Sequence, residues 1–377
     1  MKGLQQLINQ LCPNGVEWKS LGEVCHTITT GRLNANAMVE NGIYPFFTCD
    51  KKVFTINSYA FDCEAILVSG NGSQVGHINY YKGKFNAYQR TYVLTDLIGI
   101  AYPFLLHYFH SYLKDYILAN CKKGAVPYIT LPMLQDFPIP LPPLAIQSRI
   151  VEILDHFTNL TANLTAELAL RSKQFEHFRE KLLSLDGVDG VEWKTLGEVA
   201  EYSKSRIESK ELNNDNYVSV ENLLQNKKGK VKSECCPVTG NWIKFVVGDV
   251  LIGNIRPYLR KIWLADSIGG TNGDVLAIHI KNRKELYPEY LYYVLSSEDF
   301  FIYDTDNSKG AKMPRGDKKA ILAYTIPVPP LAVQHSIVEK LDKFTALILN
   351  IENELALRQK QYEYYREKLL SFPSPSL

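Results

Sequence analysis

The chain has 377 residues, of which 46% are hydrophobic and 22% are charged, a composition typical of globular proteins with two or three domains. The sequence has no apolar run long enough to span a membrane and no secretory signal at its start, so we expect a cytoplasmic protein without a membrane partner. The net charge of +2 neither requires nor excludes a nucleic-acid partner, and the seven cysteines show no metal-binding spacing and are expected to be reduced.

The chain begins with a short segment, residues 1–15, that we expect to be helical. It leads into the decapeptide GVEWKSLGEV, which starts at Gly15. The stretch up to residue 141 mixes short apolar runs with polar turns, and it has the length of an ordinary domain. We therefore expect an α/β-type globular domain over residues 16–141.

A long helix is predicted next, because residues 144–185 contain neither glycine nor proline, and Pro142 and Pro143 lie where a helix tolerates proline. At a rise of 1.5 Å per residue, this helix would be roughly 60 Å long. Its apolar residues alternate in steps of four and three, with one extra step of four after Leu164, which is a heptad stripe with a single stutter. We assign residues 142–189 to this helix and its flanks, and such a helix needs a partner.

The second half of the chain repeats the first. The decapeptide returns at positions 190–199 as GVEWKTLGEV, with nine of ten letters unchanged. Further matches follow in the same order, since 140–158 resembles 327–345 and 167–184 resembles 354–371, so the chain contains a two-copy repeat. We expect a second globular domain at 190–328 and, because residues 331–372 again contain neither glycine nor proline, a second long helix within 329–377.

The two long helices are each other's simplest partners, since Ile150 matches Ile337 and Leu182 matches Leu369 in the apolar stripes. Two like units that pair through like surfaces form a two-fold arrangement, which favours an antiparallel pair over a parallel one. The predicted fold is α+β, with two α/β-type globular domains joined by two long helices that form an antiparallel coiled coil, as an internal pseudo-two-fold repeat.

The segments inside this repeated frame differ, because residues 25–100 and 200–285 barely align. The runs that predict strands or buried helices in the two domains lie at residues 65–70, 91–95, 104–118, 249–254, 274–280 and 289–297. The frame must be alike in both copies to build the same structure twice, whereas the inserts are allowed or required to differ.

No known catalytic motif is found in either domain. The glycine-rich stretch at 70–76 lacks the spacing of a dinucleotide loop, and the residues after it predict a strand rather than the helix that a phosphate cradle requires. His107 and His110 lie on an apolar helix, where a packed or partly exposed histidine is more common than a metal ligand. We expect this chain to have no catalytic residue and to bind no metal or cofactor itself.

Side chains that suit DNA recognition gather in both domains. Lysine and arginine bind phosphates, whereas arginine, asparagine and glutamine also bind base edges in the major groove. In the first domain the candidates are Lys51, Lys52, Asn71, Ser73, Gln74, Gln89, Arg90, Lys122 and Lys123. In the second domain they are Lys204, Arg206, Asn254, Arg256, Tyr258, Arg260, Asn272, Lys309, Lys312 and Arg315.

The loops after the strands that end at Val68 and Ile252 are the favoured sites, because they recur at the same place with different side chains. Any single surface lysine is more often only a solvated charge. The charged loop at 226–232 is a further candidate, and solvation alone explains it equally well.

The repeated motifs resemble those of one known family. The opening GVEWKxLGEV, the helix entries at 139–147 and 326–334, and the helix exits FREKLLS and YREKLLS are similar to those of the specificity subunit of type I restriction–modification systems. The resemblance covers nearly the whole chain, twice. The chain departs from the family at one position of the helix entry. An acidic residue commonly precedes the glutamine there, whereas this chain has Ile146 and Val333. This difference bears on the docking of partner subunits rather than on DNA recognition.

The resemblance implies a function. Each domain would recognise one half of a split, asymmetric double-stranded DNA sequence, and the helices would fix the gap between the halves. The helices would also dock two methyltransferase (modification) subunits, which carry S-adenosylmethionine and methylate adenine. A restriction/motor subunit that uses ATP and Mg would join for cleavage, and this chain would itself be non-catalytic.

Three alternatives are left open: an orphan or silent specificity protein without active partners, a coiled-coil adaptor that does not bind DNA, and an enzyme whose site carries no familiar motif. DNA binding that weakens steeply with salt would argue against the adaptor, because proteins that contact phosphates displace counterions.

Overall fold

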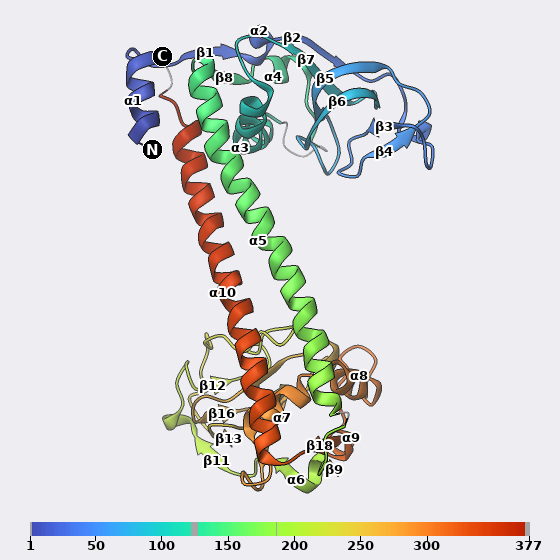
Figure 1. Cartoon of the computed structure of the whole chain (residues 1–377), viewed down its shortest axis with the longest axis vertical. Coiled ribbons are helices and arrows are strands. Elements are labelled where there is room, and N and C mark those ends of the chain that lie inside the picture. The colour runs from blue at the N-terminus through green and yellow to red at the C-terminus, as the bar shows by residue number, and fades with distance from the viewer. Residues whose placement is uncertain (1, 122–126, 186, 374–377) are drawn as a thin grey trace. The chain divides into compact units, whose positions relative to one another are not determined.

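The computed structural model describes residues 2–121, 127–185 and 187–373. The chain forms two compact units: unit 1 consists of Met1–Thr165 and Asn353–Leu377, and unit 2 of Ala166–Glu352. Each unit contains one globular domain and a stretch of each of two long helices, so both helices pass from one unit into the other (Figure 1).

Each domain is entered and left through a two-stranded antiparallel ribbon, β1 with β8 in unit 1 and β9 with β18 in unit 2. One turn of helix follows the first strand of each ribbon. These elements are β1 (Glu17–Ser20), α2 (Leu21–Val24), β8 (Pro138–Leu141), β9 (Glu192–Thr195), α6 (Leu196–Val199) and β18 (Thr325–Val328).

A capping box at the start of α2 and α6 gives one physical reason for the close repetition of the decapeptide. The Glu23 carboxylate accepts hydrogen bonds from the backbone nitrogen and the hydroxyl of Ser20, at 2.7 and 2.8 Å, and these bonds lower the pKa of Glu23. Glu198 accepts the same two bonds from Thr195, at 2.6 and 2.8 Å. The serine-to-threonine difference between the copies keeps the box, because both residues carry the hydroxyl.

The domain of unit 1 is built on a six-stranded sheet with the order β2-β7-β5-β6-β3-β4. Its strands are β2 (Cys25–Thr30), β3 (Tyr44–Phe47), β4 (Phe54–Ile56), β5 (Phe61–Ser69), β6 (Ile78–Ala87) and β7 (Thr91–Leu97), with a 3₁₀ turn, η1 (Ala35–Ala37), after β2. The helix α3 (Tyr102–Asn120) packs on one face, and α4 (Leu131–Gln135) follows it. The strand predicted after the glycine-rich stretch is β6, which confirms that no helix begins there.

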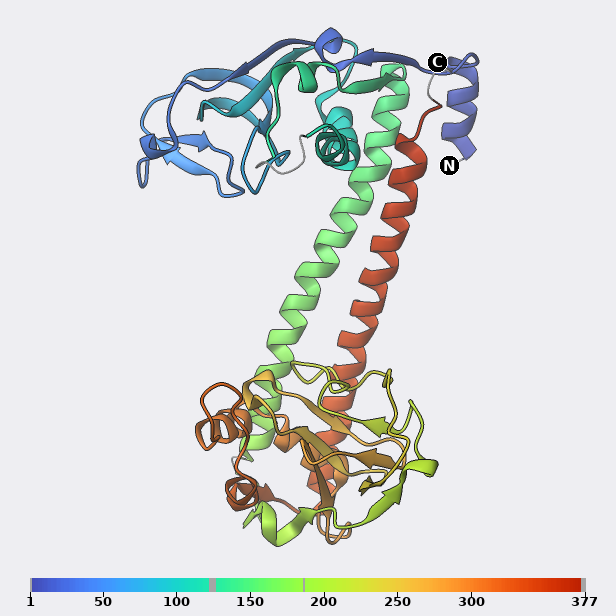
Figure 2. The same ribbon diagram turned by 180° about the vertical axis from the view of Figure 1, so that it is seen from behind.

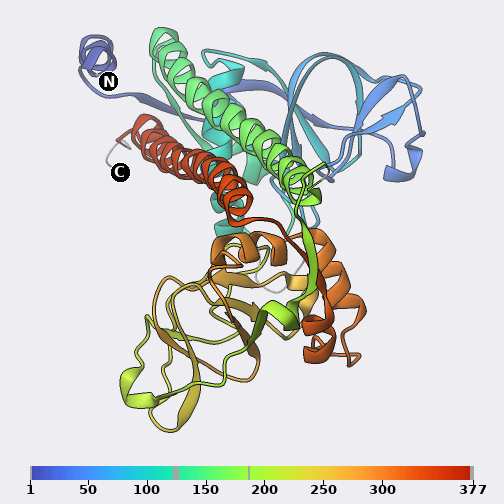
Figure 3. The same cartoon turned by 60° about the horizontal axis from the view of Figure 1, so that its bottom comes forward.

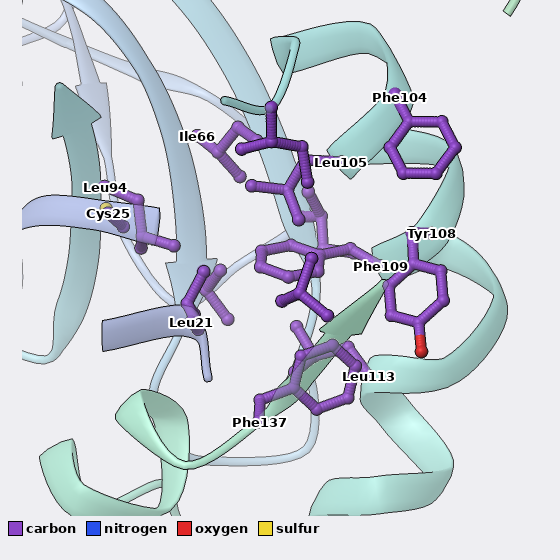
Figure 4. Close-up of a cluster of buried hydrophobic side chains, with 14 of the residues drawn as sticks. Leu21, Cys25, Ile66, Leu94, Phe104, Leu105, Tyr108, Phe109, Leu113 and Phe137 are labelled. Atoms are coloured by element: carbon purple, nitrogen blue, oxygen red, sulfur yellow. The ribbon is translucent and has the colours of Figure 1, made fainter. Parts of the chain in front are cut away.

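The core of this domain lies between the sheet and α3 (Figure 4). Ile66 and Leu94 come from central strands, Phe109 from α3 and Phe137 from the chain just before β8, and all four are buried. Leu21 of the decapeptide is fully buried in the same cluster. Because each such side chain stabilises the fold by about 1.5–3 kcal/mol when buried, the decapeptide contributes to the core as well as to the ribbon.

The domain of unit 2 has two four-stranded sheets, with the orders β10-β17-β14-β15 and β11-β13-β16-β12. Its strands are β10 (Ala200–Tyr202), β11 (Arg206–Glu208), β12 (Tyr217–Val218), β13 (Asn241–Phe245), β14 (Val250–Gly253), β15 (Ile262–Leu264), β16 (Gly269–Thr271) and β17 (Val275–Ile280). Its short helices are η2 (Ser209–Glu211), η3 (Pro257–Leu259), α7 (Pro288–Leu295), α8 (Glu298–Asp306) and α9 (Lys318–Ala323). Figures 1 and 3 show α8 and α9, in orange to brown, on the side of the unit away from β11 and β13.

The two domains share a four-stranded sheet although their sequences barely align. The order β2-β7-β5-β6 in unit 1 matches β10-β17-β14-β15 in unit 2, and every pair is antiparallel. The register of the central pair also matches: Leu67 faces Val93 and Val68 faces Tyr92 in unit 1, as Leu251 faces Ala277 in unit 2 and its neighbour Ile252 faces Leu276. Sequence comparison missed this similarity because a buried strand tolerates exchange among apolar residues when the packing around it adjusts.

Two long helices, α5 and α10, pack antiparallel within each unit (Figure 2). Their bounds are Leu144–Ser184 and Leu331–Leu370. In unit 1 the first turns of α5 contact the last turns of α10, and Phe157 stacks on Tyr365 with ring centroids 5.2 Å apart. In unit 2 the last turns of α5 contact the first turns of α10, and Phe178 stacks on Phe344 at the same distance. The predicted α+β class with two domains is confirmed, and the direction of the helix pair within each unit is the predicted one.

The N-terminal segment forms α1 (Lys2–Leu11). Leu7 and Ile8 of this helix are partly buried against the core cluster of unit 1. Within the described ranges, no helix combines the length and the apolar character that crossing a membrane demands.

Candidate nucleic-acid interface

In unit 1, the loop that follows β5 is fixed by main-chain hydrogen bonds to two other loops. The nitrogen of Gly70 donates to the carbonyl of Arg90 at 2.8 Å, and the carbonyl of Gly70 accepts from the nitrogen of Ile129 at 2.7 Å. Asn71 forms an antiparallel β-bridge with Tyr128. We call this meeting point the unit 1 junction; its loops are residues 70–77, 88–90 and 127–130.

Glycine is required where these loops meet. A Cβ atom on Gly70 would collide with the carbonyl of Arg90 and lie 3.1 Å from the ring of Tyr92. A fourth loop joins the junction, because the nitrogen of Gln89 donates to the carbonyl of Leu33 at 2.9 Å. Arg32, next to Leu33, is exposed and becomes a candidate that sequence reasoning missed.

A pocket of about 600 Å³ in unit 1 brings several predicted residues together. Its lining includes Lys51, Ser73 and Gln74 from the predicted set, and His77, His110 and Lys114 from α3 and the loop before β6. Burial lowers the pKa of His110, and burial together with the charge of Lys51 lowers the pKa of His77. The pocket therefore combines two lysines with neutral hydrogen-bonding groups, which suits a phosphate or a base edge.

The other predicted residues of unit 1 have different surroundings. Gln89 and Arg90 are exposed at the turn between β6 and β7. Lys52 is exposed, with its Nζ 5.6 Å from the centroid of the Phe54 ring. Lys122 and Lys123 lie outside the described residues.

Unit 2 builds the same junction with different side chains. The nitrogen of Asn254 donates to the carbonyl of Asp274 at 2.8 Å, and the carbonyl of Asn254 accepts from the nitrogen of Gly316 at 3.1 Å. Ile255 forms an antiparallel bridge with Arg315. Each of these contacts has a counterpart in the unit 1 junction. Asn254 takes the place of Gly70, Asp274 that of Arg90 and Arg315 that of Tyr128. We call this meeting point the unit 2 junction; its loops are residues 254–260, 272–274 and 309–316.

Arg256 and Arg260 flank the turn η3, and both have left-handed backbone, with φ of 55° and 52°. Such backbone costs energy for a residue other than glycine and persists where surrounding contacts impose it. The nitrogen of Arg256 donates to the carbonyl of Pro314 at 2.7 Å, and the guanidinium of Arg260 is ion-paired with Glu298 of α8. The turn is therefore held from both sides, and it presents an exposed Arg256.

The loop at 226–232 supports this turn. The nitrogen of Lys227 donates to the carbonyl of Arg260 at 2.9 Å, and its ammonium lies 3.2 Å from the carboxylate of Glu176 on α5. Burial lowers the pKa of Lys227. These contacts favour a structural role for Lys227 over direct contact with DNA.

The structure places two predicted amides of unit 2, Asn254 and Asn272, within the junction loops. Asn254 is 4% exposed, so it does not present its amide at the surface, contrary to the expectation that it contacts a base. The side-chain oxygen of Asn272 accepts from the nitrogen of Asp274 at 3.0 Å, which shapes the loop before β17. Asn272 therefore shapes a junction loop through its side chain, whereas Asn254 joins the junction through its main chain.

The exposed residues at the unit 2 junction are Arg256, Tyr258, Lys309, Lys312 and Arg315. Two of them are paired with acidic groups. Arg315 lies 3.3 Å from Asp274, and Lys309 is ion-paired with Asp317. Both of these cations remain at the surface, where such pairs are weak and a phosphate competes for them.

Lys204 lies in the connection from β10 to β11, and Arg206 is the first residue of β11. Lys204 is paired with Glu201 at 2.6 Å, and Arg206 is exposed on β11, opposite Ile243 of β13. Most of the predicted residues of unit 2 lie on the junction loops, whereas Arg206 lies two strands from Thr271, the residue before Asn272.

Comparison with known proteins identifies relatives of the chain. The family model of the type I restriction modification DNA specificity domain matches residues 13–170 and 189–357. The specificity subunit of the Escherichia coli type I restriction enzyme EcoDI is 29% identical over 381 residues, which cover 90% of this chain and 84% of that protein. The EcoR124I/EcoR124II specificity subunit, also from Escherichia coli, is 35% identical over 266 residues, or 64% of each chain.

Solved structures have the same fold over nearly the whole chain. The crystal structure of the S subunit of a type I restriction–modification system from M. genitalium has a TM-score of 0.63 at 16% identity, covering 96% of this chain and 98% of that chain. A chain from a structure on complex assembly and conformational transition of the type I R-M system has a TM-score of 0.59 at 18% identity, covering 95% and 98%. Each half of the chain is matched separately by the family model, and the chain belongs to the type I restriction modification DNA specificity domain family.

Proposed function

We propose that this chain is the DNA-recognition subunit of a type I restriction–modification complex, in which each unit recognises one half of a bipartite, asymmetric DNA sequence. The observation that carries the proposal is the repeated junction, one main-chain arrangement built twice with different side chains. Two unlike half-sites can be recognised when the same main-chain arrangement presents different side chains to each of them.

The exposed side chains at each junction are the proposed contacts with DNA. In unit 1 these are Gln89 and Arg90, together with the pocket that Lys51 lines, and in unit 2 they are Arg256 and Arg315. An arginine that makes two hydrogen bonds to a guanine contributes about 1–3 kcal/mol of discrimination between bases. Lysines nearby would bind phosphates and position the protein without reading the sequence.

The partners of the chain would carry the chemistry. Two methyltransferase subunits would hold S-adenosylmethionine, and a restriction/motor subunit would use ATP and Mg, so this chain needs no catalytic residue. The helices α5 and α10 would dock these subunits and fix the spacing of the half-sites. Support for the spacing role is the length of both helices, 41 and 40 residues, which run without a break.

The test is to express the chain with its methyltransferase partner in a methylation-free host and to map methylated adenines in the DNA by single-molecule sequencing. We expect one bipartite motif with two unlike halves that appears only when this chain is present. A chain that gives no methylation with an active partner contradicts the proposal. Binding of purified chain to DNA at several salt concentrations then separates a silent specificity protein, with a steep salt dependence, from an adaptor that does not bind DNA.

A further inference from the structure

Beneath the unit 2 junction, three buried oxygen atoms have no hydrogen-bond partner among the residues that the structure describes. They are both carboxylate oxygens of Asp304, on α8, and the side-chain oxygen of Asn254. Asp304 is fully buried and Asn254 is 4% exposed. A buried acceptor without a donor is costly, and a charged one more so, so this group requires a donor.

Two of these oxygens, Oδ1 of Asp304 and Oδ1 of Asn254, lie beside Gly316. A Cβ atom on Gly316 would collide with Oδ1 of Asp304 and would lie 2.8 Å from Oδ1 of Asn254. The nitrogen of Gly316 also donates to the carbonyl of Asn254, which is one of the contacts of the unit 2 junction. The loop that carries Arg315 therefore closes directly over the Asp304 carboxyl group.

We propose that Asp304 keeps its proton in the folded protein and acts as the positioning residue of the unit 2 junction, with its carboxyl proton directed toward the side-chain oxygen of Asn254. The proton supplies a donor for the side-chain oxygen of Asn254 and removes a charge from a buried place. Asp304 touches no DNA; it acts through Gly316 and Asn254 on the loops that present Arg315 and Arg256. The inference rests on the proposed function, since it assigns a role to those loops in binding the second half-site.

The surroundings of Asp304 favour the neutral acid. Burial raises the pKa of Asp304 to about 7, and no cation among the described residues offsets that rise. Tyr202 of β10 is a titratable group that faces it; burial, and then the charges of Asp304 and Asp317, raise the pKa of Tyr202, so it stays protonated and donates to the carbonyl of Lys318 at 2.9 Å. Asp317, at the start of α9, is ion-paired with Lys309.

A pH dependence follows. Because the pKa of Asp304 is higher in the folded protein than in the unfolded chain, the stabilisation is complete below the pKa of the unfolded chain and is lost as the pH rises from there through 7. Above that point each pH unit raises the ratio of ionised to protonated Asp304 about tenfold. An ionised carboxylate beside the oxygen of Asn254 would open the loop at Gly316. Unit 1 has Gly70 in the place of Asn254, so the effect belongs to the second half-site alone.

The first experiment measures stability without DNA. The full-length wild-type chain, Asp304→Asn and Asp306→Asn are melted between pH 5.5 and pH 8.5; Asp306 is exposed on the same helix and serves as the matched control. We expect the melting temperature of the wild type to fall relative to that of Asp304→Asn between pH 5.5 and pH 7 and to level off above pH 7, and Asp306→Asn to follow the wild type. Parallel curves for the wild type and Asp304→Asn would overturn the proposal.

A second measurement uses the wild-type chain and does not depend on how well the variant folds. The infrared band of a protonated carboxyl group should be present at pH 6, weaken through pH 7 and be nearly lost at pH 8.5. The same band should be absent from Asp304→Asn and present in Asp306→Asn. A wild-type chain without this band at pH 6 contradicts a protonated Asp304.

The third experiment links the proton to DNA, with a labelled duplex that carries the mapped site and a second duplex whose second half-site is scrambled. At pH 6 the wild type and Asp304→Asn should bind the first duplex equally, and at pH 8.5 Asp304→Asn should bind it at least about tenfold more tightly. The scrambled duplex should show no such difference. Equal affinities at pH 8.5 overturn the role of Asp304, whereas failure of the proposed function looks different: the wild type at pH 6 would not distinguish the two duplexes at all.

Discussion

Gln147 and Gln334 make the same three hydrogen bonds, one set in each unit. The side-chain oxygen of Gln147 accepts from the nitrogen of Ala101 at 2.8 Å, and its amide nitrogen donates to the carbonyls of Gly99 and Pro142 at 2.9 and 2.8 Å. Gln334 makes the equivalent bonds in unit 2, at 2.8 Å each. Both side chains are fully buried, so an amide ties the start of each long helix to the segment that leads into the helix of the domain.

Replacing Gln147 by leucine should destabilise unit 1 by several kcal/mol, because three backbone groups lose their partner at about 1–3 kcal/mol each. We expect a lower midpoint of urea unfolding and faster amide exchange at Ala101 and at the start of α5. Gln10→Leu is the control, since Gln10 is exposed on α1. Unchanged amide exchange at Ala101 in the Gln147 variant would show that the amide does not hold this segment.

Arg256→Ala should relax specificity in the second half-site and leave the first unchanged. The loss of one arginine with two hydrogen bonds to a base costs about 1–3 kcal/mol, and only for the sequences that contain this base. Competition binding with a panel of duplexes altered at single positions measures the effect. Arg90→Ala is the matched variant in unit 1 and should relax the first half-site instead. Uniform weakening toward every duplex would identify Arg256 as a phosphate contact.

Lengthening both long helices should lengthen the DNA spacer. Phe157 lies opposite Tyr365, so Leu164, one heptad further along α5, lies opposite Arg358 in unit 1. Seven residues inserted after Leu164 and seven before Arg358 extend the pair by about 10.5 Å, or about three base pairs. Methylation mapping reports the new spacer directly.

The control for this experiment is the insertion in α5 alone, which displaces one apolar stripe against the other and should lower the melting temperature of the chain. A doubly extended chain that is folded and active, and still recognises the original spacer, would refute the spacing role of the helices.

A fragment of residues 1–187 should form a dimer. In the intact chain, Ile150 is buried in a cluster with Leu369 and Leu370 of α10, which the fragment lacks. Leu182 and Leu183 of α5 are the counterparts of those two leucines in the repeat, so a second copy can supply the same surface. Mismatched packing would cost about 1–3 kcal/mol, and association carries an entropy cost, yet we expect dimers at micromolar concentration.

Analytical ultracentrifugation measures the association of this fragment. The dimer would carry two copies of the first domain, so the DNA that it recognises should be an interrupted palindrome of the first half-site. A folded monomer at tens of micromolar would show that α5 cannot replace α10.

Much of the fold could be predicted from the sequence, because the strongest signals are local. The absence of glycine and proline and the heptad spacing predicted helices at 144–185 and 331–372, and the structure has them at Leu144–Ser184 and Leu331–Leu370. The common four-stranded sheet of the two domains was missed, because its register is set by pairing between distant strands, which leaves no shared sequence.

The candidate site could be predicted only in part. Arg256 follows a strand and is exposed, as the sequence indicated. Asn254, two positions earlier, is buried because Gly316, far along the chain, packs on it. Arg32 was missed because the parallel bridge between Leu33 and Tyr88 brings it to the junction from a distant part of the sequence. The exposure of these side chains, and their distances from one another, depend on contacts between residues far apart in the sequence. Composition and motif spacing do not report such contacts.

The main-chain character of the two junctions has an evolutionary consequence. Hydrogen bonds between peptide groups form whichever side chains flank them, apart from the places where a glycine such as Gly70 or Gly316 is sterically required. Arg90 in one copy and Asp274 in the other contribute a main-chain carbonyl to the bonds with Gly70 and Asn254 at the two junctions. Selection for a new DNA target can therefore change the side chains at these positions without loss of the fold. After the duplication, each half of the chain diverges independently. One ancestral domain can thus give rise to many different pairs of half-site specificities.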